Sequence, residues 1–159
     1  MKKRNNKGFS LVELIVVIGI MAVLIAILVP SLISHSNKTK RSVDVNTADE
    51  IVGCITRVLS ADTELYYSLA DNAGTVTKFS WTSSTTMDDV KSNPAVYAIF
   101  EDFGEVPKSK WNGHLDWLIT FNGTKVHIYL VDDPSDSYGY ELYPDSDAFV
   151  KKKDKVKIQ

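Results

Sequence analysis

The feature that most constrains this chain is an apolar run close to its first residue. The run extends from Phe9 to Ile33, and the residues that interrupt it are Ser10, Glu13, Pro30 and Ser31. A helix needs about 20 residues, each adding about 1.5 Å of rise, to cross the hydrocarbon core of a bilayer. The run is long enough for this, so the sequence predicts one membrane-spanning helix near the N-terminal end.

A short basic segment precedes the apolar run. Residues 1–8 contain four basic side chains and no acidic one, and Gly8 stands at the boundary. A secretory signal peptide also begins with a basic segment and an apolar core, but its small-residue cleavage site follows the core. No convincing site of that kind follows Ile33. Cleavage at Gly8 would instead remove the basic leader and leave the apolar helix on the protein; an uncleaved signal anchor is the remaining alternative.

Basic residues flank the run on its other side as well. The leader has four positive side chains, and the segment after the run has three, which are Lys38, Lys40 and Arg41. Positively charged flanks tend to stay in the cytoplasm. The difference of one charge favours a cytoplasmic N-terminus by a small margin, with the rest of the chain outside.

Glu13 is the ionisable residue within the apolar run. A carboxylate one turn into a membrane helix can reach the interface, where it needs no function, yet ionisable residues inside a membrane usually have a partner. Cleavage after Gly8 would create one, because Phe9 would then carry a positive α-amino group. Among packed apolar helices, this ammonium and Glu13 of a neighbouring chain would neutralise each other and set the axial register between subunits. The residues alone leave both interpretations open.

The segment Gly8–Leu14, with the sequence GFSLVEL, resembles the class III signal of type IV prepilins. The resemblance covers about residues 1–35 and names the family, not the individual protein. It implies that a prepilin peptidase cuts between Gly8 and Phe9 and N-methylates Phe9, and that Glu13 guides the docking of subunits into a growing filament.

Two further residues of the apolar run bear on the shape of its helix. The resemblance implies a helix-bending role for Pro30, and proline also removes a backbone donor and clashes with the preceding turn. Gly19 is a second weak point, since glycine stabilises a helix less than other residues do. We therefore expect helix kinks at Gly19 and Pro30.

Beyond the run, the sequence predicts that the helix continues into a folded head. Apolar residues recur from Ala48 to Leu69 at spacings of three and four, which is typical of an amphipathic helix. The sequence Asp71–Gly74 is a suitable stop. We divide the chain into a cleaved leader at 1–8, a transmembrane and filament-core helix at 9–34, an amphipathic helix at 35–74, and the β-sheet part of the globular head at 75–159.

The segment 75–159 contains local signals for strands and for one short helix. The clearest is a hairpin, in which LDWLITF and KVHIYLV flank the turn residues Asn122–Thr124. Other expected elements are a strand at Thr75–Trp81, a helix at Ala95–Phe103 that ends at Gly104, and strands at Tyr138–Tyr143 and Phe149–Gln159. The predicted fold class is α+β, with a long N-terminal helix, half of it transmembrane, packed on a small antiparallel sheet, as in type IV pilins.

Composition narrows the chemistry of the head. Cys54 is the one cysteine, so an internal disulfide is impossible and a core position is the favoured interpretation. Many pilins of diderm bacteria close their C-terminal region with a disulfide; this departure favours a Gram-positive or otherwise disulfide-poor host. We expect no cofactor. The alternative is calcium bound by the acidic loop of Asp132, Asp133 and Asp136, but acidic loops are usually only solvated.

Enzymatic and nucleic-acid functions find little support. The chain has no nucleophile elbow, P-loop or dinucleotide fingerprint, so we expect no enzyme. The basic tail Lys151–Lys157 is the one possible start of a DNA-binding surface, and an edge strand kept soluble by lysines is the favoured interpretation. The formal net charge is −2 and would fall to −6 (−2 minus 4) on loss of the leader, which disfavours nucleic acid as a partner.

The resemblance implies a structural role. The expected function is a prepilin that is processed and polymerised into a type IV pilus for adhesion, motility or biofilm formation. The alternative within the class is a pseudopilin of a type II secretion or competence DNA-uptake system, and an anchored enzyme is the rival from another class. Expected partners are copies of itself in a helical homopolymer, the prepilin peptidase, and an assembly platform protein with its ATPase. The expected location is the cytoplasmic membrane, with the head outside, before assembly, and an extracellular filament afterwards.

Overall fold

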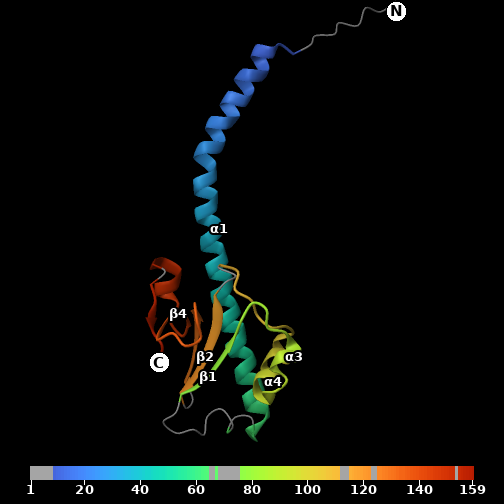
Figure 1. Ribbon diagram of the computed structural model, residues 1–159, viewed down its shortest axis with the longest axis vertical. Coiled ribbons are helices and arrows are strands. Elements are labelled where there is room, and N and C mark those ends of the chain that lie inside the picture. Colours follow the sequence, from blue (N-terminus) through green and yellow to red (C-terminus); the bar gives the residue numbers. More distant parts are fainter. Residues whose placement is uncertain (1–8, 65–66, 68–75, 112–114, 123–124, 153) are drawn as a thin grey trace, which may run out of the picture. The chain divides into compact units, whose positions relative to one another are not determined.

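The computed structural model describes residues 9–64, 67, 76–111, 115–122, 125–152 and 154–159. The chain divides into two compact units, Met1–Asn37 and Lys38–Gln159, and we call the second the head unit. The elements are α1 (Leu11–Ala61), β1 (Thr77–Trp81), α3 (Met87–Val90), α4 (Pro94–Phe103), β2 (Asp116–Asn122), β3 (Lys125–Val131), β4 (Tyr138–Tyr143), η1 (Ala148–Lys152) and β5 (Val156–Lys157) (Figure 1).

The first unit contains the N-terminal part of α1. Its large apolar side chains from Leu11 to Ile33 are exposed, and α1 holds a window long and apolar enough to cross a membrane, none of which is buried. The helical backbone continues without interruption through Gly19 and Pro30. The kinks expected at these two residues therefore stay predictions.

In the head unit, α1 presents one buried face. Ala48, Ile51, Cys54 and Ile55 follow each other at spacings of three, three and one, and all are buried. This is the apolar face that the periodicity predicts. The element ends at Ala61, whereas the predicted stop at residues 71–74 lies outside the described residues.

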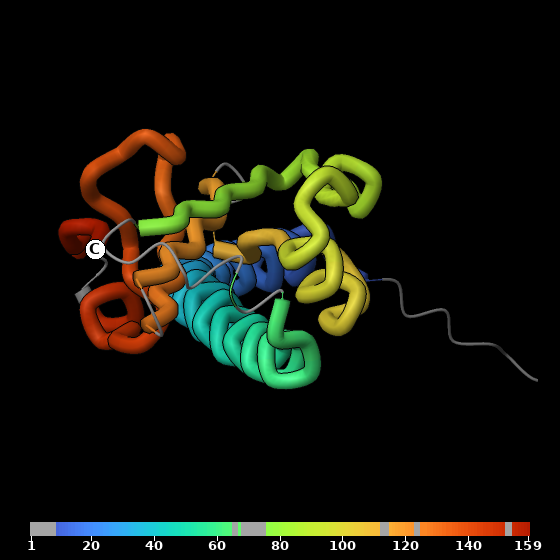
Figure 2. The backbone as a smooth tube through the Cα atoms, turned by 90° about the horizontal axis from the view of Figure 1, so that it is seen from below, coloured from blue at the N-terminus to red at the C-terminus, as the bar shows by residue number. Residues whose placement is uncertain are grey.

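The sheet of the head unit is antiparallel throughout and has the order β1-β2-β3-β4-β5. The predicted hairpin is confirmed, with Asn122 opposite Lys125 and Asp116 opposite Val131; the turn residues 123–124 lie outside the described residues. Figure 2 shows α3 and α4 on one side of the head part of α1 and the strands β2 to β4 on its other side.

Tryptophan and phenylalanine side chains fill the core between α1, α4 and the sheet. Trp81 of β1 stacks on Trp117 of β2 with ring centroids 5.7 Å apart, and Phe100 of α4 meets Trp81 edge-on at 4.9 Å. On the opposite face of the sheet, Leu118, Tyr129 and Val131 are buried under Val156 and Ile158. Aromatic pairs of this kind add to the stability that burial provides.

The predicted helix at Ala95–Phe103 is confirmed as α4, and both of its ends follow the sequence. The side chain of Asn93 accepts a hydrogen bond from Val96 N at 3.3 Å, Pro94 occupies the first turn, and Gly104 takes the left-handed conformation with φ of 96°. Only glycine adopts such a φ without strain.

The single strand predicted at Phe149–Gln159 is wrong in its extent. The structure has the helical turn η1 followed by β5, which is limited to Val156 and Lys157. The physical reason is the side chain of Phe149, which is fully buried and packs edge-on against Trp111 at 5.2 Å. A strand that began there would move this ring away from its partner.

The fold class is α+β, as predicted. A long N-terminal helix packs, through its head part, on a five-stranded antiparallel sheet, and this is a pilin-like architecture. The head unit includes the C-terminal part of α1, from Lys38 to Ala61, in its core, while the large apolar side chains of the first unit are exposed.

Candidate processing and assembly segment

The predicted processing and assembly residues lie at the start of α1. Phe9 is 85% exposed and precedes the helix, which begins at Leu11. Gly8, the other residue of the predicted cleavage pair, lies outside the described residues. An exposed, non-helical stretch suits a peptidase substrate, because cleavage needs an accessible backbone. The cleavage between Gly8 and Phe9 and the methylation of Phe9 stay predictions.

Glu13 has a local partner that was not expected. Its Oε2 accepts a hydrogen bond from the backbone N–H of Ser10 at 2.8 Å, and Leu14 N donates to the carbonyl of Ser10 at 3.2 Å. Ser10 is the residue before the first helical turn and Glu13 is the third residue of the helix. This is one half of a capping box, and the negative charge also lies favourably at a helix N-terminus. The S-x-x-E spacing of Ser10 and Glu13 was the signal for it in the sequence.

The capping contact bears on the predicted role of Glu13 in docking. A carboxylate has about four lone-pair sites, so one bond to Ser10 leaves capacity for an ammonium group. Cleavage after Gly8 would place a new positive charge on Phe9, next to Ser10 in the chain. The cap keeps the carboxylate at the first turn of α1; its pairing with the ammonium group of a neighbouring chain stays a prediction.

The exposed apolar segment after Glu13 supplies the second part of the predicted machinery. A side chain added at Gly19 would meet nothing within 4 Å, so this glycine is not required by crowding within the chain. An uncovered apolar helix of this length has two environments that bury it, which are lipid and other apolar helices.

A buried aspartate, Asp44, attaches a distant loop to α1 where the head unit begins. Its carboxylate accepts bonds from Ser109 Oγ at 2.9 Å, Lys110 N at 2.6 Å and Trp111 N at 2.9 Å. Burial raises the pKa of Asp44, and the three hydrogen bonds and the charge of Lys110 partly oppose this rise. Sequence reasoning missed Asp44, although it continues the spacing of Ala48 and Ile51 by one turn.

Beside Asp44, a second charged side chain of α1 is buried. Arg41 is 7% exposed, and its guanidinium carbon lies 5.9 Å from the ring centroid of Trp111. Neither Nε nor Nη1 of Arg41 has a hydrogen-bond partner among the described residues. The stacking on Trp111 is a cation–π contact, which compensates a part of the cost of burial.

The lone cysteine lies in the core, as predicted. Cys54 is buried, and Arg57 Nη2 donates to its Sγ at 3.2 Å while the same guanidinium pairs with Asp102 of α4 at 2.7 Å. Burial and the neighbouring carboxylate of Asp102 raise the pKa of the Cys54 thiol, which keeps it protonated and weakly nucleophilic.

The acidic loop considered for calcium is held together by other contacts. Asp132 forms an ion pair with Lys155, and Asp133 accepts bonds from the backbone and hydroxyl of Ser135, which lower the pKa of Asp133. No group of three or more metal-ligating side chains suited to a metal ion occurs within the residues that the structure describes. The expected absence of a cofactor stays a prediction.

Comparison with known proteins gives one match. The family model described as the prokaryotic N-terminal methylation motif matches residues 3–29, a segment that includes Gly8, Phe9, Glu13 and Gly19. Neither the curated proteins nor the solved structures contain a match to this chain. Proteins with this motif are structural rather than catalytic as a family. The chain therefore carries the class III signal of type IV pilin-like proteins, and this motif indicates a type IV pilin-like prepilin.

Proposed function

We propose that this protein is a structural subunit of a type IV pilus. In this proposal the prepilin peptidase removes residues 1–8 and methylates Phe9, and the processed subunit is polymerised into a surface filament. Adhesion, motility or biofilm formation would be the role of that filament. The observation that carries the proposal is the combination of the methylation motif at residues 3–29 with an apolar helix that is uncovered in the single chain.

The exposed apolar segment supports polymerisation on physical grounds. Its side chains from Leu11 to Ile33 are exposed, and none of the window that could span a membrane is buried. In the membrane, lipid covers this surface; after extraction, the same surface must be covered by neighbouring helices. An assembly platform and its ATPase would supply the work of extraction, and the filament core would restore the lost apolar contacts.

Glu13 and the new α-amino group of Phe9 support a defined register in that core. The carboxylate is the one ionisable group among the exposed apolar residues of the described segment 9–33. An unpaired charge inside a packed apolar bundle is costly, so a subunit that docks with Glu13 beside an ammonium group is favoured over one shifted along the axis. The pair selects among positions, while apolar burial supplies the affinity.

Mass spectrometry of the protein's N-terminus tests the proposal. Native membranes and sheared surface filaments should be compared, and a chain that begins at methylated Phe9 is expected in the sheared fraction. Methylated Phe9 found only in the membrane fraction, with no filament outside the cell, would favour a pseudopilin. An N-terminus at Met1 or Lys2, or a cut after the apolar run that frees the head, would overturn the prepilin assignment.

A further inference from the structure

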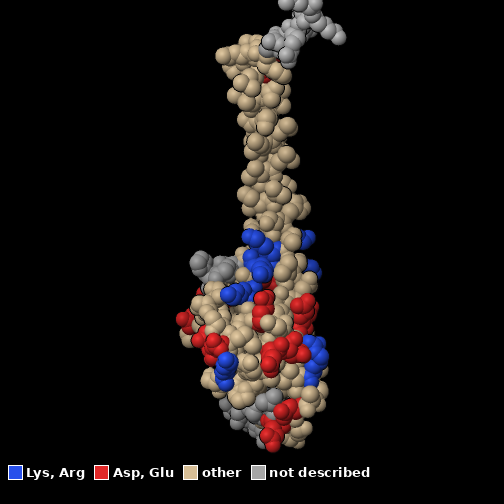
Figure 3. Space-filling view, turned by 90° about the vertical axis from the view of Figure 1, so that its right-hand side faces the viewer, with Lys and Arg blue, Asp and Glu red and all other residues tan. Residues whose placement is uncertain are grey.

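Five basic side chains gather at the end of the head unit where α1 begins to pack on the sheet. Lys38, Lys40 and Arg41 belong to α1, and Lys108 and Lys110 belong to the loop after α4; we call these five residues the basic collar. Figure 3 shows blue side chains concentrated at this end of the head unit.

Contacts from α1 hold the loop part of the basic collar in place. Asp44 accepts bonds from the backbone N–H groups of Lys110 and Trp111, and Arg41 stacks on the ring of Trp111. Trp111 in turn packs against Phe149 of η1 at 5.2 Å. The loop is therefore fixed to the first turns of the head part of α1, and its lysines belong to the same surface as those of the helix.

The positive charge of the collar is compensated only in part within the described residues, because the buried carboxylate of Asp44 interacts with the charge of Lys110. Its four lysines are exposed, and the structure shows no ion pair for any of them. Arg41 is buried with two nitrogens unpartnered. By contrast, Lys91, Lys151 and Lys155 each pair with an aspartate. A group of unpaired cations creates a positive potential that attracts an anionic partner.

The rest of the head unit has the opposite charge. Residues 38–159 contain 14 basic and 19 acidic side chains, a formal net charge of −5 (14 minus 19). Figure 3 shows the acidic side chains along the body of the unit beyond the collar. An anionic surface would therefore repel the head in most orientations and attract it through the collar.

The position of the collar along α1 indicates what that anionic surface is. Lys38 follows Ile33, the last residue of the apolar run, by five residues in the sequence. Basic residues that follow a membrane-spanning run this closely in sequence are typical of the layer in which lipid headgroups lie. Exposed lysines together with a tryptophan are typical of this zone, and Trp111 of the collar loop is half-buried.

We propose that the basic collar binds the phosphate-bearing headgroups of anionic phospholipids while the subunit waits in the membrane. The proposal rests on the membrane placement that is part of the proposed function. Each lysine near an anionic membrane surface increases the affinity for that surface roughly fivefold at low salt. Extraction of a subunit into a filament then requires that the collar release these headgroups and that the apolar helix leave the lipid.

A lipid titration tests the collar. The full-length chain in neutral maltoside micelles is titrated with dihexanoyl phosphatidylglycerol, dihexanoyl phosphatidylcholine or soluble glycerol phosphate, and tryptophan fluorescence is followed. Trp81 and Trp117 are buried and stacked on each other, so the change should come from Trp111. The anionic lipid should bind more tightly than the other two compounds, and salt should weaken it because the lysines are exposed.

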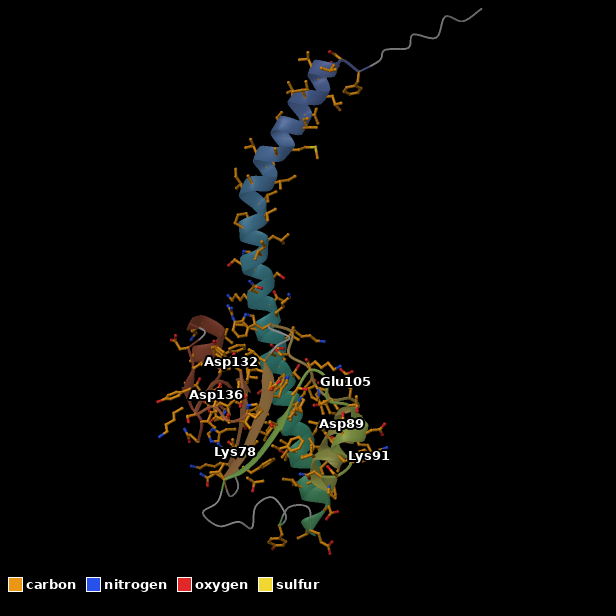
Figure 4. All side chains as sticks on the ribbon, viewed as in Figure 1. Lys78, Asp89, Lys91, Glu105, Asp132 and Asp136 are labelled. Atoms are coloured by element: carbon orange, nitrogen blue, oxygen red, sulfur yellow. The ribbon has the colours of Figure 1, made fainter. Side chains whose placement is uncertain are left out.

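Matched variants distinguish the effect of the collar lysines on lipid binding from the effect of the overall net charge. Lys108→Gln together with Lys110→Gln should weaken phosphatidylglycerol binding roughly 25-fold at low salt. The control is Lys78→Gln together with Lys125→Gln, which removes the same charge from exposed lysines outside the collar; Figure 4 shows Lys78 toward the other end of the head unit. The control should bind like the original chain, and both variants should keep its urea midpoint.

Three results would overturn the proposal. Equal affinity for the anionic and zwitterionic lipids would remove the lipid preference, and equally tight binding of soluble glycerol phosphate would assign the site to free phosphate. A collar variant that keeps lipid binding but loses filament assembly would assign the collar to an acidic surface of a neighbouring subunit. Vesicle flotation distinguishes the collar proposal from the proposed function. A chain that does not float with the vesicles refutes the membrane placement. A chain that floats but shows no preference for anionic lipid refutes the collar proposal alone.

Discussion

Asp44 connects two segments that are 65 to 67 residues apart in sequence, and its replacement by alanine removes all three bonds at once. The Ser109 hydroxyl can turn to another acceptor. The backbone N–H groups of Lys110 and Trp111 cannot turn, and they would be left part-buried without the carboxylate. We therefore expect Asp44→Ala to destabilise the head unit through these two donors.

The magnitude follows from the state of the two donors. A buried donor that loses its acceptor costs about 1–3 kcal/mol, so two donors cost about 2–6 kcal/mol. Two terms reduce this sum. The donors are only partly buried, and removal of the carboxylate also relieves its own desolvation, which is the largest cause of the raised pKa of Asp44. The net expectation is a loss of about 2–4 kcal/mol in the free energy of unfolding.

Urea unfolding of the full-length chain in maltoside micelles measures this loss, with tryptophan fluorescence as the signal. The matched control is Asp49→Ala, which removes an exposed aspartate from the same helix. The control should change the free energy of unfolding by less than about 0.5 kcal/mol. If Asp44→Ala falls within that same range, the bonds to residues 109–111 do not contribute net stability and the reasoning is refuted.

Three further predictions concern pH, glycine and the N-terminal segment. The pKa of Asp44 in the folded protein is raised above its usual 3.8. The stability that Asp44 contributes is therefore full below about pH 3.8 and declines as the pH rises through the folded pKa. The difference in unfolding free energy between the original chain and Asp44→Asn should decline over that window, and a constant difference would contradict this. Gly139→Ala should cost about 1–3 kcal/mol in urea unfolding, because its Cβ would lie 2.9 Å from Val131 Cγ1 and 3.2 Å from the carbonyl of Leu130. In Gly53→Ala the nearest neighbour of the added Cβ would be Arg57 Nη1 at 3.4 Å. This variant should instead stabilise α1 by up to about 1 kcal/mol. Equal losses of stability in both variants would show that crowding at Gly139 is not the cause. Glu13→Gln keeps an oxygen that can accept a hydrogen bond from Ser10 N–H but removes the charge. The urea midpoint of the head should therefore not change, while the amount of subunit in sheared filaments should fall. A normal filament yield would exclude a docking role for the charge.

Several elements of the head were predictable because their signals are local. The hairpin of β2 and β3 follows from two apolar strands around an Asn-Gly turn, and α4 follows from an Asn93 cap, Pro94 in the first turn and Gly104 at the end. The capping bond of Glu13 to Ser10 belongs to the same kind, since it joins residues three apart. Interactions of this range need no knowledge of the rest of the chain.

The C-terminal tail shows where local patterns fail. Alternating apolar residues from Phe149 onward are consistent with a strand, but the burial of Phe149 against Trp111 and Tyr140 competes with strand formation. The tertiary contact wins, and η1 replaces the first four residues of the predicted strand. Strand propensity is a weak preference compared with the burial of an aromatic ring.

The sequence by itself determined the apolar helix, the methylation motif, the β2–β3 hairpin and α4, because hydrophobic length, short motifs and turn residues act over a few neighbouring positions. Only the tertiary structure decided that Asp44 would hold residues 109–111 and that Arg41 would lie on Trp111. It also decided that lysines from two distant segments would share one end of the head. These contacts join residues more than 60 positions apart, and their partners are selected by the packing of α1 on the sheet, which no local pattern specifies.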